Sequence, residues 1–378
     1  MLSNKTVRIL SLDGGGTRGF IQSYFLEKFC LKAGITKLAN YFDLIAGAPV
    51  GGINAVAFAD GLSPESMCSF FREKTPWIFT IRSATDLLSD KAEEPSNKPN
   101  AIQKAYMLGV SDPFYKSVSP NSNYGDARLK KEIQNIFENR ILTSINTPVL
   151  LTAHNYSKQH PLVFTNISMS AVPETFRKQK IVDVLMGTSA APIYFPSYNI
   201  HLSADPEEPD DKIIDGGLFQ NNPVSLALST AISLYPSAKR YCILSIGTGL
   251  GSIRTKTLSE EPSPSEASIA KYLNLLDIVI SNAEHSNDLC FKALHDLAFD
   301  TNFFYYRFNI NLDPNRDCEL DTSTSDFFDY LEQTVDEKIL EDDYELGQFI
   351  SRFVDIDGSE MNSDIRGIQT NTSTPQNG

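Results

Sequence analysis

The stretch 43–54 joins an apolar run to a turn rich in glycine and proline, a pattern that can present a catalytic nucleophile. Leu44–Ala46 predicts a buried strand, and a run compatible with a helix follows the turn. A strand, a sharp turn and a helix are the setting of the Gly-x-Ser-x-Gly motif of serine hydrolases. The frame is present as Gly47 and Gly51, but its central residue is Pro49. Proline has no hydroxyl, so this position cannot form an acyl-enzyme.

A glycine-rich loop between a predicted strand and a predicted helix is the second feature that could take part in catalysis or binding. It reads Asp13-Gly14-Gly15-Gly16-Thr17-Arg18-Gly19. The pattern Gly-x-Gly-x-x-Gly fits a dinucleotide-binding turn, an oxyanion hole built from backbone N–H groups, or a tight loop with no chemical role. No clean strand with an acidic ribose-binding residue follows at the expected distance, which argues against the dinucleotide.

An aspartate at a strand end is the third feature. Ile213 and Ile214 predict a short buried strand, and Asp215-Gly216-Gly217 follows it. A carboxylate that is fixed by a strand and approachable between glycines suits a general base. The alternative is an aspartate that only stabilises a turn.

In this order, the three motifs resemble those of the patatin-like phospholipase family. Its signatures are Asp-Gly-Gly-Gly-x-Arg-Gly, Gly-x-Ser-x-Gly-Gly and Asp-Gly-Gly or Asp-Gly-Ala. The resemblance runs from about Val7 to Gly249 and, more loosely, to Asn309. Three further segments share it: Gly187–Pro196, Asn221-Asn222-Pro223 and Ile246–Gly249.

The resemblance implies a lipid acyl hydrolase, similar in topology to α/β-hydrolases, that uses a Ser–Asp dyad. By motif position, residue 49 would be the nucleophile and Asp215 the general base. Gly14–Gly19 would be the oxyanion hole, with Arg18 near the oxyanion or a phosphate, unless Arg18 forms only a surface salt bridge.

Pro49 is where this chain departs from the family. It removes the nucleophile, and it holds φ near −65°, whereas a nucleophile elbow is usually strained at positive φ. We therefore expect the chain as written to be inactive. Ser189 is a poor substitute, because its segment is structural in the family and lacks the closing glycine of the motif. The alternative is a pseudoenzyme that binds lipid or a protein partner through the retained groove.

Composition excludes several classes of function. The formal net charge of −14 argues against binding to nucleic acid. Five scattered cysteines and five histidines outside the motifs give no metal-binding pattern, and no cofactor is expected. The expected partner is a lipid or phospholipid substrate, attracted by a local apolar patch, and peripheral contact with a membrane is compatible with this. Oligomeric state is left open.

The start of the chain contains no long apolar run of the kind found in signal peptides, and no stretch is long enough to span a membrane. We therefore expect a cytoplasmic protein, or one exported without a cleavable signal peptide.

Strands that alternate with helices predict an α/β fold with a largely parallel central sheet. The family resemblance refines this to a three-layer α/β/α domain over residues 1–310. A helical C-terminal extension over 311–355 packs on it, and a polar tail over 356–378 is expected to be disordered. Residues 83–123 predict a loop-rich insertion. The main predicted helices are Phe20–Lys32, Asp126–Asn139, Ile181–Ser189 and Pro223–Leu234.

Overall fold

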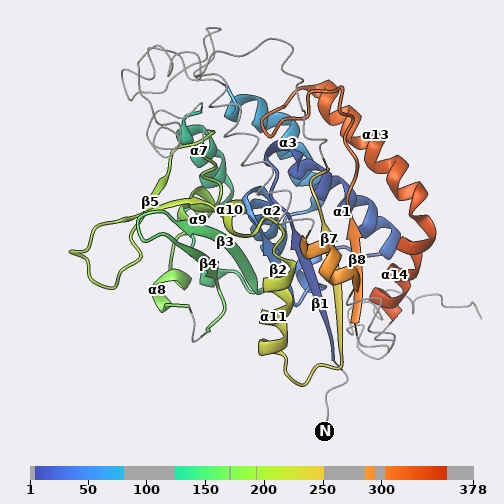
Figure 1. Ribbon diagram of the computed structural model, residues 1–378, viewed down its shortest axis with the longest axis horizontal. Helices are drawn as coiled ribbons and strands as arrows, with labels where there is room; N and C mark the ends of the chain where they lie inside the picture. Colours follow the sequence, from blue (N-terminus) through green and yellow to red (C-terminus); the bar gives the residue numbers. More distant parts are fainter. Residues whose placement is uncertain are drawn as a thin grey trace, which may run out of the picture.

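The computed structural model describes residues 5–80, 124–169, 172–192, 194–250, 286–293 and 303–355. The predicted insertion at 83–123 and the predicted tail at 356–378 lie outside the described residues. Within them, the chain forms one large sheet with helices on both faces (Figure 1).

The sheet has the order β5-β6-β3-β2-β1-β7-β8, and β4 pairs with β3 beside this path. The five neighbouring strands β3, β2, β1, β7 and β8 are parallel to one another. Strands β4 and β6 each pair antiparallel with β3, and β5 pairs antiparallel with β6. This confirms the predicted α/β fold with a largely parallel sheet. The strands are β1 (Thr6–Leu12), β2 (Leu44–Gly47), β3 (Val149–Asn155), β4 (His160–Thr165), β5 (Tyr198–Ile200), β6 (Asp211–Asp215), β7 (Arg240–Ile246) and β8 (Phe303–Phe308).

The central strands are buried on both faces, which explains why they are nearly continuous apolar runs. Leu10 and Leu12 of β1 face one layer of helices, and Val7 and Ile9 face the other. The first layer contains α1 (Phe20–Ala33), α2 (Pro49–Ala59), α3 (Pro64–Ile78), α7 (Asp126–Phe137), α9 (Ile181–Thr188), α13 (Ser325–Glu341) and α14 (Asp343–Asp355). The second contains α11 (Val224–Leu234) and the helical residues 286–293. Two short helices, α8 (Glu174–Arg177) and α10 (Gly217–Gln220), follow β4 and β6.

Two strand ends meet on one edge of β3. Antiparallel β4 pairs with β3 from Leu150 to Asn155 and so fills one edge completely. Parallel β2 and antiparallel β6 must therefore share the other edge, where Gly47 lies opposite Leu151 and Asp215 opposite Ala153. Because β2 and β6 run toward each other, their C-terminal ends converge at the same place.

The last two helices lie against the first. Figure 1 shows α13 running beside α1, and Phe20 of α1 packs on Phe328 of α13 with ring centroids 5.0 Å apart. The Arg8 side chain donates a hydrogen bond to the carbonyl of Phe353 in the last turn of α14, where a positive charge is favourable. The predicted division between a domain and an extension at residue 310 stays a prediction.

None of the helices in the described part of the chain combines the length and the apolar character that crossing a bilayer requires.

Candidate active site

The turn at Pro49 lies where β2 ends and α2 begins. Ala48 has an extended backbone (φ −108°, ψ 153°), and Pro49 is the first residue of the helix. Proline suits this position because its missing N–H would have no partner within the helix and its φ is already helical. No non-glycine residue of this turn has a positive φ. The turn is therefore unstrained.

The glycine loop runs directly beside this turn. A Cβ atom on Gly14 would lie 3.1 Å from Cδ of Pro49 and 2.2 Å from Oδ1 of Asn221. A Cβ atom on Gly51, in the first turn of α2, would lie 2.3 Å from the Leu12 carbonyl that precedes the loop. Glycines at these positions let the two backbones approach so closely.

Most hydrogen-bonding groups of the loop are already paired. The Gly14 N–H donates to the Asn221 carbonyl (3.0 Å), and the Thr17 N–H donates to the Leu320 carbonyl (2.8 Å). Among the described residues, the N–H groups of Gly15 and Gly16 meet no acceptor. Both glycines are partly exposed, whereas Gly14 and Thr17 are buried. Two adjacent amides are thus free to bind a negatively charged oxygen.

Asp215, the last residue of β6, is 8% exposed. One of its carboxylate oxygens accepts a hydrogen bond from the Gly217 N–H (2.5 Å), and none of the ion pairs between described residues includes it. Burial raises the pKa of Asp215 to about 7, although the hydrogen bond from Gly217 acts in the opposite direction. A carboxyl group with such a pKa can both accept and release a proton near neutral pH.

The side chain of Asn221 connects Asp215 to the turn. A Cβ atom on Gly217 would lie 2.9 Å from Oδ1 of Asp215 and 2.9 Å from Oδ1 of Asn221. The same Asn221 oxygen faces the Cα atom of Gly14, beside Pro49, and Nδ2 of Asn221 donates a long hydrogen bond to the Gly14 carbonyl (3.4 Å). The fold therefore brings together the residues that the three motifs predicted. Their catalytic roles remain predictions.

Arg18 and Ser189 lie near the same corner. Nε of Arg18 is 3.4 Å from the Gly15 carbonyl, to which it donates a long hydrogen bond. Ser189 follows the last residue of α9, and its hydroxyl is buried with no hydrogen-bond partner among the described residues. The next carbonyl, of Ala190, accepts from the Asp215 N–H (3.1 Å). This segment thus supports the backbone of Asp215.

Sequence reasoning missed a buried polar network beneath the loop, formed by Gln22, Asn54 and Arg307. The Gln22 side chain donates to the Asp13 carbonyl (2.8 Å), and the Asn54 side chain donates to Gln22 Oε1 (2.9 Å). Arg307 pairs with the Asp13 carboxylate. One signal was available for Arg307: it is the only charged residue in the aromatic strand Phe303–Phe308.

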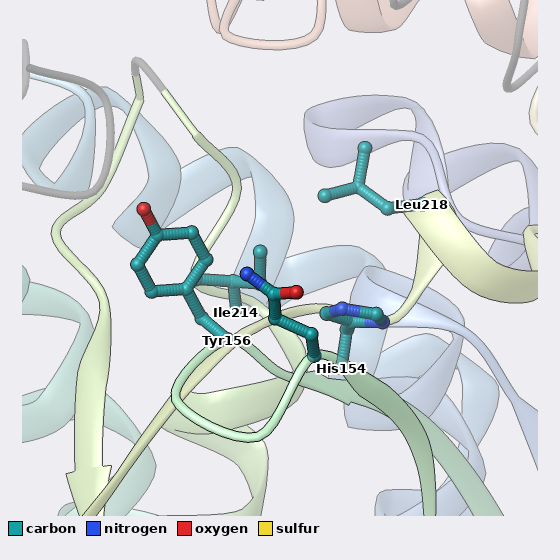
Figure 2. A pocket seen from close by; sticks show the side chains of 5 residues that line it. His154, Tyr156, Ile214 and Leu218 are labelled. Carbon is teal, nitrogen blue, oxygen red and sulfur yellow. The ribbon is translucent and has the colours of Figure 1, made fainter. Parts of the chain in front are cut away.

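A hollow of about 300 Å³ lies on the opposite face of the sheet (Figure 2). It is lined by His154 and Tyr156 from β3 and the following turn, Gln159, Ile214 and Leu218. Because successive side chains of a strand point to opposite faces, Ile214 points into this hollow and Asp215 points away from it. The hollow is therefore separate from the corner at Pro49.

The described residues contain no group of three or more His, Cys, Asp or Glu side chains that could hold a metal ion.

Known proteins similar to this chain were found by sequence and by structure. The sequence profile of the patatin-like phospholipase family matches residues 10–228, more than half of the chain. The cGAMP-activated phospholipase of Vibrio cholerae serotype O1 is 30% identical over 344 residues, which cover 84% of this chain and 86% of that protein. The probable inactive patatin-like protein 9 of Arabidopsis thaliana is 25% identical over 307 residues, which cover 76% of this chain and 71% of that protein.

Among solved structures, human GIVD cytosolic phospholipase A2 in complex with methyl gamma-linolenyl fluorophosphonate aligns with a TM-score of 0.46 at 12% identity. The alignment covers 93% of this chain and 59% of that one. The matched profile and the extended similarity to the Vibrio protein show that this chain belongs to the patatin-like phospholipase family.

Proposed function

We propose that this chain carries the site of a lipid acyl hydrolase of the patatin type, in which Pro49 occupies the nucleophile position. The observation that carries the proposal is the convergence of Pro49, two free loop amides and Asp215 at one corner. Family membership supports a lipid or phospholipid ester as the substrate and peripheral contact with a lipid surface.

In this proposal a serine at position 49 would attack the carbonyl carbon of an acyl ester. Its proton would pass to the Asp215 carboxylate, and the carbonyl oxygen would become an oxyanion held by the N–H groups of Gly15 and Gly16. The tetrahedral intermediate would then release the alcohol, which takes the proton back from Asp215. Water would repeat the sequence on the acyl-enzyme and release the fatty acid.

With proline at position 49, the chain as written has no hydroxyl to begin this sequence. We therefore propose that it does not hydrolyse lipid esters. A second candidate is a protein that binds a lipid or a protein partner at this corner without the chemistry. The unstrained turn at Pro49 favours it, and so does similarity to a plant relative whose name marks it as probably inactive.

The substitution Pro49→Ser separates the two candidates. Ester hydrolysis is measured on a fluorogenic ester and on phospholipid vesicles, with Pro49→Ala as the control that lacks the hydroxyl. Because the Vibrio relative is named as activated by cGAMP, each protein is assayed with and without cGAMP. Activity in the serine variant, and its loss in the variant that also carries Asp215→Asn, supports the hydrolase. A folded serine variant that stays inert under every condition supports the binding protein.

A further inference from the structure

A buried ion pair links the first residue of the glycine loop to a strand far along the chain. Asp13 is fully buried, and the side chain of Arg307 on β8 is 5% exposed. The guanidinium group donates to both carboxylate oxygens, at 3.0 Å and 2.5 Å, and also to the hydroxyl of Ser245 (2.9 Å). Arg307 lies outside the segment 10–228 that the family profile matches.

Stability alone does not account for this pair. Removing two charges from water costs several kcal/mol per ion, and apolar side chains of similar volume are often as stabilising or more so. A bidentate contact between a guanidinium and a carboxylate also fixes the relative orientation of the two groups. The pair is therefore suited to hold Asp13 in one position.

The backbone of Asp13 is held from two further directions. Its N–H donates to the Ile246 carbonyl at the end of β7 (3.1 Å), and its carbonyl accepts from the Gln22 side chain (2.8 Å). The next residue, Gly14, is bonded through its N–H to Asn221. Gly15 and Gly16, whose amides are free, follow immediately. Asp13 therefore begins the short stretch of backbone that carries these two amides, and Gly14 is also held through its carbonyl, which accepts from the Thr248 hydroxyl (2.6 Å).

The far end of the loop is fixed by neutral groups. Nδ2 of Asn54 donates to the Gly19 carbonyl (3.0 Å) and to Oε1 of Gln22 (2.9 Å). Asn54 lies on α2, the helix that Pro49 begins. The same network therefore ties the loop to the nucleophile helix, and Arg307 supplies its charged contact.

We propose that Arg307 is a positioning residue of the site: through Asp13 it sets where the Gly15 and Gly16 amides point. The proposal rests on the proposed function only in assigning those amides to an oxyanion. That Arg307 holds the loop in place can be tested without turnover.

The test compares Arg307→Met with Arg140→Met in the full chain. Arg140 forms a guanidinium–carboxylate pair of the same geometry with Asp60, at 2.7 Å and 2.5 Å, at the other end of α2. The double variant Asp13→Asn with Arg307→Met removes both buried charges, so that no unpaired charge is left buried, as it would be in the single variant. Hydrogen exchange is measured on peptides covering residues 13–19, and melting temperatures are recorded for every protein.

We expect exchange in residues 13–19 to rise at least ~10-fold in both Arg307 variants and to stay unchanged in Arg140→Met, because the hydrogen bonds of Gly14, Thr17 and Arg18 loosen with the loop. On the Pro49→Ser background, Arg307→Met should lower kcat by ~10-fold to 100-fold with little change in KM, since one oxyanion donor is worth about 10²–10³.

The assignment would be overturned if hydrogen exchange in residues 13–19 increased only in proportion to the loss of melting temperature, equally in the Arg307 variants and in Arg140→Met. If the loop responds to Arg307 but Pro49→Ser remains inert, the hydrolase proposal fails while the positioning of the loop by Arg307 stands.

Discussion

The two sides of the corner differ in how many of the groups needed for ester hydrolysis they contain: the glycine loop and Asp215 form one side, and the turn at Pro49 forms the other. On one side, the glycine loop has two amides that meet no acceptor among the described residues and a buried network that fixes it, and Asp215 has a pKa near neutrality. On the other side, the turn at Pro49 has no hydroxyl at this position and no positive φ at a non-glycine residue, and Pro49 begins an ordinary helix. A site that had long been out of use should have lost features on both sides. If the proposed function is right, the difference favours an isolated change at position 49 over a general decay.

The largest expected effect is a gain of activity. Because removing a nucleophile from a serine hydrolase costs ~10⁶-fold in turnover, Pro49→Ser should raise ester hydrolysis at least ~10²-fold even if the turn is imperfect. The measurement is the initial rate on a fluorogenic ester, together with labelling by a fluorophosphonate. Pro49→Ala should show neither. Labelling of the parent chain, or of the alanine variant, would mean that another residue such as Ser189 is the nucleophile.

The second effect concerns Asp215 and is a change in stability with pH. Its pKa is about 7 in the folded chain and 3.8 when unfolded, so between these values the unfolded state releases the proton first. Stability is therefore lost as pH rises from about 4 to about 7, by up to about 4 kcal/mol in total. Asp215→Asn should remove this loss and stabilise the chain most at pH 8.

The measurement is urea unfolding of the parent and of Asp215→Asn at pH 4 and at pH 8. The difference between the two proteins should be near zero at pH 4 and favour asparagine at pH 8. A difference that is the same at both pH values would show that the carboxyl group is not desolvated. Asp215 would then be ionised at neutral pH like an ordinary carboxylate, and the raised pKa of the proposed general base would be refuted.

The third effect tests how closely the two sides approach. Gly14→Ala would place a methyl group 2.2 Å from Oδ1 of Asn221 and 3.1 Å from Cδ of Pro49. Such overpacking typically costs ~1–3 kcal/mol. Gly347→Ala, in α14 with no atom of the described residues within 4 Å of the new group, is the matched control and should stabilise the chain by up to ~1 kcal/mol. Thermal unfolding measures both, and equal effects would contradict the close packing of loop and turn.

Much of the fold could be predicted from the sequence because its signals are local. The strand Leu44–Gly47 and the helix Ile181–Thr188 were both expected from their apolar residues, with ends within one residue of those observed. Helix α3 likewise begins at a local signal: Pro64 is its first residue, and the preceding Ser63 hydroxyl accepts a hydrogen bond from the Ser66 N–H. Capping and periodicity depend only on neighbours in the sequence.

The candidate site was harder to predict from the sequence, because its assembly depends on contacts between distant segments. The motifs predicted which residues would matter, but not that β2 and β6 share one edge of β3 and so bring Gly47 and Asp215 together. No local pattern could show that Arg307 reaches Asp13, 294 residues away. Nor could the sequence show which loop amides remain free, since Thr17 is paired with Leu320 from the C-terminal third.

The smallest effect concerns the turn itself, and it distinguishes a merely substituted corner from one that has been rebuilt. Proline at the first position of α2 restricts the unfolded chain, so replacing it where the backbone stays helical should cost ~0.4–1 kcal/mol. We expect Pro49→Ser to lose only this amount, because Ala48 and Pro49 show that the surroundings accept an unstrained backbone. If the serine instead recovered the strained geometry of an elbow at positive φ, the loss should be ~1–3 kcal/mol larger. Chemical denaturation of the parent and of Pro49→Ser resolves the two cases. A small loss together with recovered hydrolysis would show that the chemistry here does not need the strained turn. A large loss of stability with recovered hydrolysis would show that the surroundings still impose the strained turn. Proline would then have relieved the strain of this turn as well as removed the activity.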